Sequence, residues 1–414
     1  MNKEFFIRNR KNLGNTMEEG VAVIFAGKAP YKSADETYAF TPNRNFYYLT
    51  GIDEEQIILV ITKKNEEIEE YLYIQRPDPI MARWLGATIS EEEAKKVSGV
   101  ENIKYVDKFF DDFPFFINRK GFNKVYLDLE RREWEENFTP PAQIFAKGLK
   151  ERYPPSLKIK NIYKNICSLR AIKSSEEVEL IKKAIDITKE GIYNMMKNIK
   201  PNIMEYEVEA YFDFSLKKNG GVTDYAFKTI VASGKNATVL HYSQNNSKID
   251  NNALMLCDLG AQYRYYNGDI SRTFPANGRF TERQKEVYNV VLEANKAIIE
   301  NAKPGVTFKE IEDITKKTLS KGCKKLGILK DEKELRKYYF HSFGHYLGLD
   351  THDVGSYEVE LKPGMVITNE PGLYIEEESI GIRIEDDLLI TEDGCEVLSK
   401  DIIKSIEDIE NFMK

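Results

Sequence analysis

The sequence is poor in histidine, cysteine and tryptophan, and it contains no long apolar run. Its cysteines form no CxxC pair, which excludes a zinc ribbon or a disulfide scaffold; they are Cys167, Cys257, Cys323 and Cys395. Buried free thiols in a reducing compartment are the simpler interpretation. No stretch of about 18 consecutive apolar residues occurs, and no apolar run follows the charged N-terminal residues. We therefore expect a cytoplasmic protein that is neither exported nor membrane-spanning.

The sequence also has no excess of basic over acidic residues. The chain has 60 lysines and arginines against 67 aspartates and glutamates, for a net charge of -7. Without a basic surface, nucleic acid and anionic membranes are not expected partners. The hydrophobic content of 42% is that of a folded globular protein. A chain of 414 residues exceeds the size of a single hydrophobic core, so we expect two domains.

The first 150 or so residues have the pattern of a mixed α/β domain. Short β-branched and aromatic runs alternate with charged helical stretches, at Val21–Gly27, Gln56–Thr62, Glu70–Gln75 and Lys124–Glu130. Adjacent prolines and a loss of helical periodicity in Glu151–Ile166 favour an interdomain connection there. We place the boundary near residue 165, with domains at 1–165 and 166–414.

The second domain should open on an amphipathic helix, because Ser174 and Glu177 have the spacing of a capping box. From Leu254 the pattern is rich in strands. A helical block near Glu282–Lys325 interrupts it, and a short amphipathic tail, Asp401–Lys414, closes the chain. The expected fold class is α/β, of the α+β type.

Three of the four histidines, His341, His345 and His352, lie in the stretch HSFGHYLGLDTHDVG. The first two have an HxxxH spacing, but Ser342 stands where a helical zinc protease has its catalytic glutamate. The third histidine is one position late for the extended form of that motif. A helical zinc site is therefore excluded, and an oxygen-rich ligand set with one imidazole suits manganese, magnesium, cobalt or iron(II) better.

Four acidic residues lie in or beside apolar, strand-like runs, where a lone carboxylate needs a cation as partner. Asp258 and Asp269 fall in two runs separated by a turn region. An antiparallel hairpin would place them about 5 Å apart, and two such carboxylates repel unless a cation lies between them. Salt bridges to Arg264 and Arg272 remain the alternative.

The same pattern recurs near the C-terminus. Glu370 ends the run MVITNE, and Glu385 lies in GIRIEDDLLI, where Arg383 shares one face of an alternating strand. A salt bridge to Arg383 would explain either acid alone. Four such acids together with a histidine cluster in one half of the chain favour a metal site.

These residues resemble a known family. HSFGHYLGLDTHDVG, the pair DLG and GDISRTFP, TNEPGLYI and SIGIRIEDD are similar to the motifs of the pita-bread metallopeptidases, and most closely to the Xaa-Pro aminopeptidases (aminopeptidase P). The match covers about Ile166–Lys414, and FTPNRNFYYLTGIDEEQIILVI extends it to the first domain. Asn45 stands where many relatives have aspartate, which weakens any transfer of contacts in the first domain.

The resemblance implies a catalytic pita-bread domain at 166–414 and an aminopeptidase P-like domain before it. It implies two divalent metal ions, with Mn²⁺ expected and Co²⁺, Zn²⁺ or Fe²⁺ as alternatives. Their implied ligands are Asp258, Asp269, His345, Glu370 and Glu385, with Asp269 and Glu385 bridging both ions. The implied substrate-binding residues are His241, His341, His352, Tyr374 and Arg383, although an Arg383 with a purely structural role remains open.

The implied reaction removes the N-terminal residue from peptides with proline second. A hydroxide shared by the metals would attack the carbonyl before proline. Glu370 would shuttle the proton, while His241 and His352 would stabilise charge on the carbonyl oxygen. His341 would face the proline, and the substrate's amino terminus would reach Asp258 and its metal.

Two alternatives of this fold are a prolidase, which cleaves only Xaa-Pro dipeptides, and a non-catalytic peptide-binding or creatinase-like protein without metals. The first would need the carboxylate of a dipeptide. The metal-free alternative disagrees with the sequence, because all five implied ligand positions carry side chains that can bind a metal. Family members are usually homodimers or homotetramers, so we expect one of these assemblies.

Overall fold

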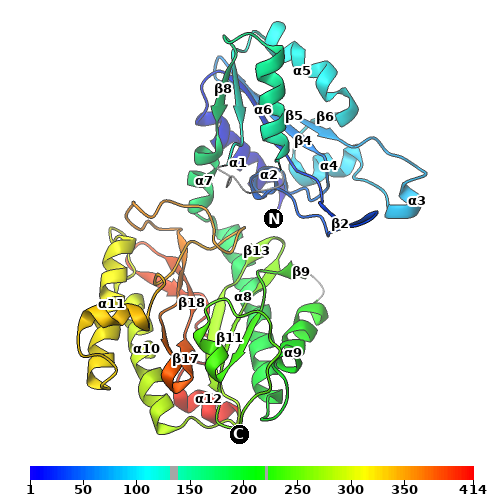
Figure 1. Cartoon of the computed structure of the whole chain (residues 1–414). Coiled ribbons are helices and arrows are strands. Elements are labelled where there is room, and N and C mark those ends of the chain that lie inside the picture. The colour runs from blue at the N-terminus through cyan, green and yellow to red at the C-terminus, as the bar shows by residue number, and fades with distance from the viewer. Residues whose placement is uncertain (131–138, 220–221) are drawn as a thin grey trace. The chain divides into compact units, whose positions relative to one another are not determined.

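The structure, a computed structural model, describes residues 1–130, 139–219 and 222–414. The chain forms two compact units, Met1–Arg170 and Ala171–Lys414 (Figure 1). The boundary suggested near residue 165 lies inside helix α7 (Tyr163–Ala171). Glu151–Ile166, which we expected to connect two domains, also contains strand β8 (Lys158–Asn161), which pairs in the sheet of the first unit.

A six-stranded mixed sheet organises the first unit. Its strand order is β6-β5-β4-β1-β7-β8, and β1 runs antiparallel to β4 but parallel to β7. The other strands are bounded as follows: β1 Gly20–Phe25, β4 Ile58–Lys64, β5 Glu67–Ile74, β6 Asn102–Tyr105 and β7 Lys124–Leu127. The four runs predicted as strands correspond to β1, β4, β5 and β7, so the mixed α/β prediction is confirmed here.

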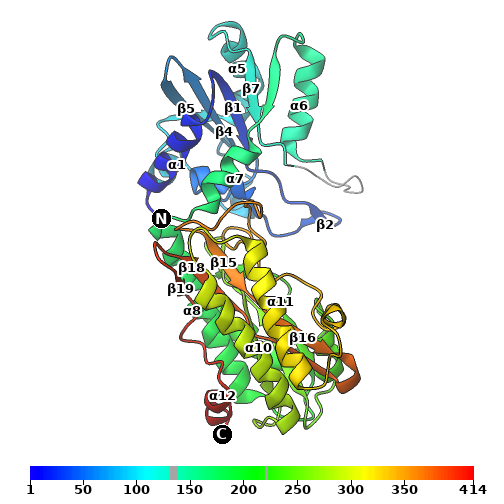
Figure 2. The same ribbon diagram turned by 90° about the vertical axis from the view of Figure 1, so that its left-hand side faces the viewer.

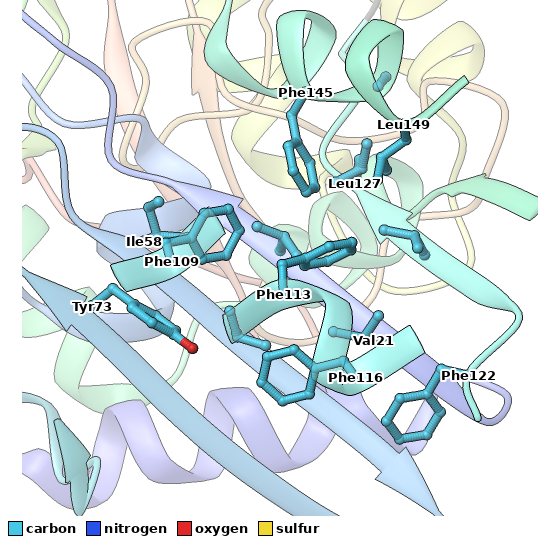
Figure 3. Close-up of a cluster of buried hydrophobic side chains, with 14 residues drawn as sticks. Val21, Ile58, Tyr73, Phe109, Phe113, Phe116, Phe122, Leu127, Phe145 and Leu149 are labelled. Carbon is cyan, nitrogen blue, oxygen red and sulfur yellow. The ribbon is translucent and has the colours of Figure 1, made fainter. Parts of the chain in front are cut away.

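Aromatic side chains fill one core of this unit (Figure 3). Phe109, Phe113 and Phe116 of α5 pack with Phe145 of α6 over the sheet, and the rings of Phe113 and Phe145 meet edge to face at 5.0 Å between centroids. The helices are α1 Lys3–Asn15, α2 Arg44–Thr50, α3 Ala82–Leu85, α4 Glu91–Ser98, η1 Val106–Lys108, α5 Phe109–Asn118 and α6 Pro141–Arg152, with a small hairpin of β2 Tyr31–Ser33 and β3 Glu36–Thr37.

In the second unit, two helix pairs flank the strands (Figures 1 and 2). One pair is α8 (Ser175–Asn198) and α9 (Glu205–Lys218), and the other is α10 (Glu282–Asn301) and α11 (Phe308–Lys325). The predicted capping box at Ser174 does begin α8. The single helical block predicted at Glu282–Lys325 is two helices, because Pro304 and a left-handed Gly305 (φ 85°) interrupt it.

The strands of this unit form short antiparallel sheets, ordered β10-β11-β14, β13-β12-β9, β15-β18-β19 and β16-β17. The first two sheets contain β9 Val222–Tyr225, β10 Ile230–Ser233, β11 Leu254–Leu259, β12 Ala261–Tyr263, β13 Tyr266–Asn267 and β14 Ile270–Pro275. The last two contain β15 Val366–Asn369, β16 Gly372–Ile375, β17 Ile380–Arg383, β18 Asp386–Ile390 and β19 Cys395–Val397. The remaining helices are η2 Gly234–Thr238, η3 Glu332–Lys337, η4 Glu376–Glu378 and α12 Ile406–Phe412.

Two expectations from composition can be compared with this fold. None of the four cysteines forms a disulfide; Cys257 and Cys323 are buried, while Cys167 and Cys395 are partly exposed. Among the described residues, none of the helices has the length and apolar character needed to cross a membrane.

Candidate metal centre

Strands β11 and β14 bring the first two acids together. Asp258 lies opposite Ser271 in their antiparallel register, and Asp269 comes directly before β14, two residues from Ser271. Side chains two residues apart share a face of the sheet, so Asp269 is a diagonal neighbour of Asp258 and not its direct cross-strand partner. Arg272, the partner that the alternative interpretation offered for these acids, instead pairs with Asp386 at 2.9 Å.

The backbone around His345 is non-helical, which agrees with the exclusion of a helical zinc-protease site. The backbone N–H of His345 donates to Oγ1 of Thr368 at 3.0 Å, and the backbone N–H of Thr368 donates to the carbonyl oxygen of His345 at 2.8 Å. Nδ1 of the ring lies 2.9 Å from the carbonyl oxygen of Tyr346. Because a carbonyl can only accept, Nδ1 carries a proton, and the neutral ring therefore presents a bare Nε2.

That nitrogen lies among carboxylates. Nε2 of His345 is 3.4 Å from Oδ2 of Asp269 and 3.5 Å from Oε1 of Glu370. Ligand atoms of Asp269, His345 and Glu385 all lie within 4.8 Å of one another. Oδ1 of Asp258 is buried and has no hydrogen-bond partner among the described residues. Four of the five side chains expected to bind metal are therefore connected through short distances, and the charge of Asp258 acts on the three other acids.

The electrostatics of the cluster indicate the charge of the ligand that it suits. Burial raises the pKa of Asp269 to about 6 and that of Glu370 to about 7, and it holds the pKa of Glu385 well above its usual range, with further increases from neighbouring carboxylates. Burial would lower the pKa of His345, but the hydrogen bond to Asp269 and the nearby acids raise it to about 9. Buried acids this close require positive charge, and divalent cations would supply it. The donor set of carboxylate oxygens and one imidazole therefore fits hard or borderline divalent metals.

Arg383 connects several of these groups. Its Nη2 pairs with Oδ2 of Asp258 at 2.6 Å, its Nη1 donates to the Tyr374 hydroxyl at 2.9 Å, and its Nε donates to Oγ of Ser271 at 2.8 Å. The Ser271 hydroxyl donates in turn to Oε2 of Glu385 at 2.8 Å. The prediction of one alternating strand carrying Arg383 and Glu385 is wrong, because Arg383 ends β17 and Glu385 precedes β18.

The other predicted histidines lie around this cluster. Nε2 of His341 is 2.9 Å from the Tyr374 hydroxyl, and Nδ1 is 3.7 Å from Oε2 of Glu370. The rings of His352 and His345 lie 4.3 Å apart between centroids. Burial and then Arg383 lower the pKa of His341 to about 4, and burial and then His345 lower the pKa of His352. The charge of His241 lowers the pKa of both, so it belongs to the same neighbourhood.

Sequence reasoning missed the hydroxyl groups that orient these side chains. Ser271 follows Asp269 by two positions, and Thr368, whose hydroxyl lies 3.4 Å from Oε1 of Glu370, precedes Glu370 by two. The alternation of side chains along a strand would have placed each hydroxyl on the same face as its acid. Asp353 also went unnoticed, although it follows His352 and forms a fully buried ion pair with Lys173 at 2.9 Å.

Comparisons with known proteins agree with this geometry. The profile of metallopeptidase family M24 matches residues 179–392, and that of the aminopeptidase P N-terminal domain matches residues 6–126. The Xaa-Pro aminopeptidases of Haemophilus influenzae and Escherichia coli are 33% and 32% identical to the chain, over 99% and 100% of it and 97% and 98% of their own lengths.

Solved structures give the same result. A structure from Bacillus anthracis, assigned provisionally as an aminopeptidase P, is 53% identical, has a TM-score of 0.98, and is matched over 100% of this chain and 98% of its own. Aminopeptidase P of E. coli with the inhibitor Pro-Leu is 32% identical, with a TM-score of 0.91 over 100% of this chain and 98% of that one. The fold of the second unit is therefore the pita-bread fold, as expected. The chain belongs to metallopeptidase family M24 and, within it, to the Xaa-Pro aminopeptidases.

Proposed function

We propose that this protein is a metal-dependent aminopeptidase that removes the N-terminal residue from peptides with proline in the second position. The observation that carries the proposal is the meeting of four acids with the His345 imidazole, whose Nδ1 contact with the Tyr346 carbonyl leaves Nε2 facing Asp269 and Glu370. The full-length match to Xaa-Pro aminopeptidases supports the substrate class.

The proposed metal ligands are Asp258, Asp269, His345, Glu370 and Glu385, with Asp269 and Glu385 shared between two sites. Two divalent cations held there would polarise the carbonyl before proline and make water a better nucleophile. We propose Mn²⁺ as the metal, with Co²⁺, Zn²⁺ or Fe²⁺ as substitutes, because oxygen-rich sites accept all of them.

The chain's own residues would handle protons and charge. Glu370, whose Oε1 lies 3.5 Å from His345 Nε2, would take a proton from the attacking water and give it to the leaving proline nitrogen. His241 and His352 would donate hydrogen bonds to the carbonyl oxygen as negative charge grows on it. Their positions around His345 and His341 favour this role.

Recognition of the two ends of the substrate would fall to other residues. The free Oδ1 of Asp258 would bind the amino terminus. His341 and Tyr374, joined by their 2.9 Å hydrogen bond, would face the proline ring with Arg383 behind them. A proline peptide bond has no N–H and a fixed φ, so a rigid pocket can select it by shape.

Three further proposals concern the protein's context. We propose the second unit as the catalytic domain and the first as the aminopeptidase P-like domain, a cytoplasmic location, and a homodimer or homotetramer. The prolidase alternative is not favoured, because the named relatives are aminopeptidases over the whole chain. A metal-free binding protein is not favoured either, because all five ligand positions carry competent side chains.

The test is an assay of purified protein, stripped with a chelator and reloaded with Mn²⁺. We expect cleavage of Xaa-Pro-Yaa tripeptides and little cleavage of Xaa-Ala-Yaa or N-acetylated Xaa-Pro-Yaa. Asp269→Asn should abolish turnover, because the amide removes a negative charge from the shared ligand. Cleavage of Xaa-Pro dipeptides alone would make the protein a prolidase, and equal cleavage of the acetylated tripeptide would contradict the amino-terminal contact at Asp258.

A further inference from the structure

Glu205, the first residue of α9, is a fully buried carboxylate outside the metal cluster. Oε1 accepts from the backbone N–H and the hydroxyl of Ser233, both at 2.7 Å, and from the Asn236 amide at 3.0 Å. Oε2 accepts from the Tyr242 hydroxyl at 2.8 Å and from the N–H of Ser247 at 2.9 Å. All five donors are uncharged groups.

These donors come from three consecutive pieces of chain that surround His241. Ser233 ends β10, Asn236 lies in η2, and Tyr242 and Ser247 lie in the segment that follows His241. The backbone N–H of Glu205 also donates to the carbonyl of Ser247 at 3.0 Å. The segment 234–247 has little regular structure of its own, so this carboxylate ties it together.

A second acid on the same helix face also binds the C-terminal part of this segment. Glu209 lies one helical turn after Glu205, and its Oε2 accepts from the Asn245 amide at 2.8 Å. Asn245, held at a positive φ of 47°, also accepts from the N–H of Val231 at 2.9 Å and donates to the carbonyl of Thr229 at 2.9 Å. Two acids of helix α9 therefore bind the His241 segment, residues 234–247, at several points along its length.

We propose that Glu205 is a positioning residue for His241, one that holds the imidazole where it can reach the carbonyl oxygen of the substrate. The inference rests on the proposed function for the role of His241 itself. His241 is exposed, and the described contacts fix its neighbours Asn236 and Tyr242 through Glu205. The geometry of the segment therefore sets where the ring can go.

Glutamine is the sharpest substitution, because it keeps the size of the side chain and removes one acceptor. In Glu205→Gln, one carboxylate oxygen becomes an NH₂ group, which can only donate. It would face donors at either position, and the backbone N–H groups of Ser233 and Ser247 cannot reverse their role. At least one buried N–H would lose its partner, and the segment should shift or loosen.

The first measurement is ¹H–¹³C NMR of protein labelled at the histidine Cε1 carbon, with Mn²⁺ replaced by diamagnetic Zn²⁺, in which the four histidines of the chain give one Cε1–H signal each. Glu205→Gln should shift or broaden the His241 signal and leave those of His341, His345 and His352 in place. Glu207→Gln is the matched control: it lies on the same helix, and its capping-box role tolerates glutamine. Unchanged His241, or equal shifts of all four signals, would overturn the proposal.

The second measurement is kinetic and uses the Mn²⁺ enzyme with an Xaa-Pro-Yaa peptide. Glu205→Gln should lower kcat by about tenfold to a hundredfold, as a misplaced group can, with KM nearly unchanged. The loss should vanish in a His241→Ala background, because the two residues act on the same step. Tyr242→Phe, which removes one donor and keeps the carboxylate, should give a smaller loss that also vanishes there.

Full additivity with His241→Ala in both variants would overturn the role through His241 and leave only a structural one. If the wild-type protein cleaves no Xaa-Pro peptide, the proposed function fails, and the NMR result alone then decides whether Glu205 places the His241 ring. The two failures are therefore distinguishable.

Discussion

At the scale of single residues, the Ser271 hydroxyl sets the orientation of two charged groups. The Arg383 Nε–H can only donate, so the hydroxyl accepts from it at 2.8 Å and its one proton goes to Glu385 Oε2, also at 2.8 Å. One oxygen atom therefore fixes the guanidinium that holds Asp258 and the carboxylate proposed to bridge the metals.

Ser271→Ala should lower kcat/KM and metal affinity. A hydrogen bond to a charged group contributes about 1.5–3 kcal/mol, which corresponds to about tenfold to a hundredfold in rate. Ser271→Thr keeps the hydroxyl and suits a strand position, so it should retain most of the activity. Steady-state kinetics and Mn²⁺ titration calorimetry measure both effects, and an alanine variant with wild-type values for both would contradict this role.

At the scale of elements, β17 and η2 pack with almost no space between their backbones. A Cβ added at Gly381 in β17 would lie 2.0 Å from the carbonyl oxygen of Ala237 in η2. This contact fixes the start of the His241 segment against the strand that ends in Arg383. Two parts of the site, far apart in sequence, are therefore held together by the absence of a side chain.

Gly381→Ala should destabilise the second unit, because the added methyl must push the two elements apart. Overpacking costs about 1–3 kcal/mol, which for a unit of this size lowers Tm by about 2–4 °C for each kcal/mol. Gly394→Ala is the matched control, since an added Cβ there meets nothing within 4 Å. Calorimetry should show a lower Tm for the first variant only, and equal values for both would disprove the close approach.

At the scale of the whole molecule, the sequence predicts more of the chemistry than of the geometry. Four acids beside apolar strands and a histidine cluster indicate a metal site, because burial makes a cation necessary. The register of strands β11 and β14 could not be predicted in the same way. The hairpin of β12 and β13 lies between Asp258 and Asp269 and makes them diagonal neighbours, not direct cross-strand partners. Glu205 could not be found, because its partners lie 28 to 42 residues away and only folding brings them together.

Metal binding should stabilise the second unit selectively, because the ligands come from four separate segments of it and repel one another otherwise. At a free Mn²⁺ concentration of about 100 times Kd, the free energy of unfolding rises by about 2.7 kcal/mol. Hydrogen exchange of amides that exchange only by global unfolding should then be slower by about a hundredfold. Hydrogen exchange measured by mass spectrometry should show this protection in Leu254–Pro275 and Val366–Ile390 on addition of Mn²⁺.

The sheet of the first unit provides the internal control for this experiment. Its strands β1 and β4 contain none of the proposed ligands, so their exchange rates should not respond to Mn²⁺. Protection of both units to the same degree would mean that they unfold together, and the selective part of the prediction would be wrong. No protection in either unit would be incompatible with a metal bound by five side chains that only the folded state assembles.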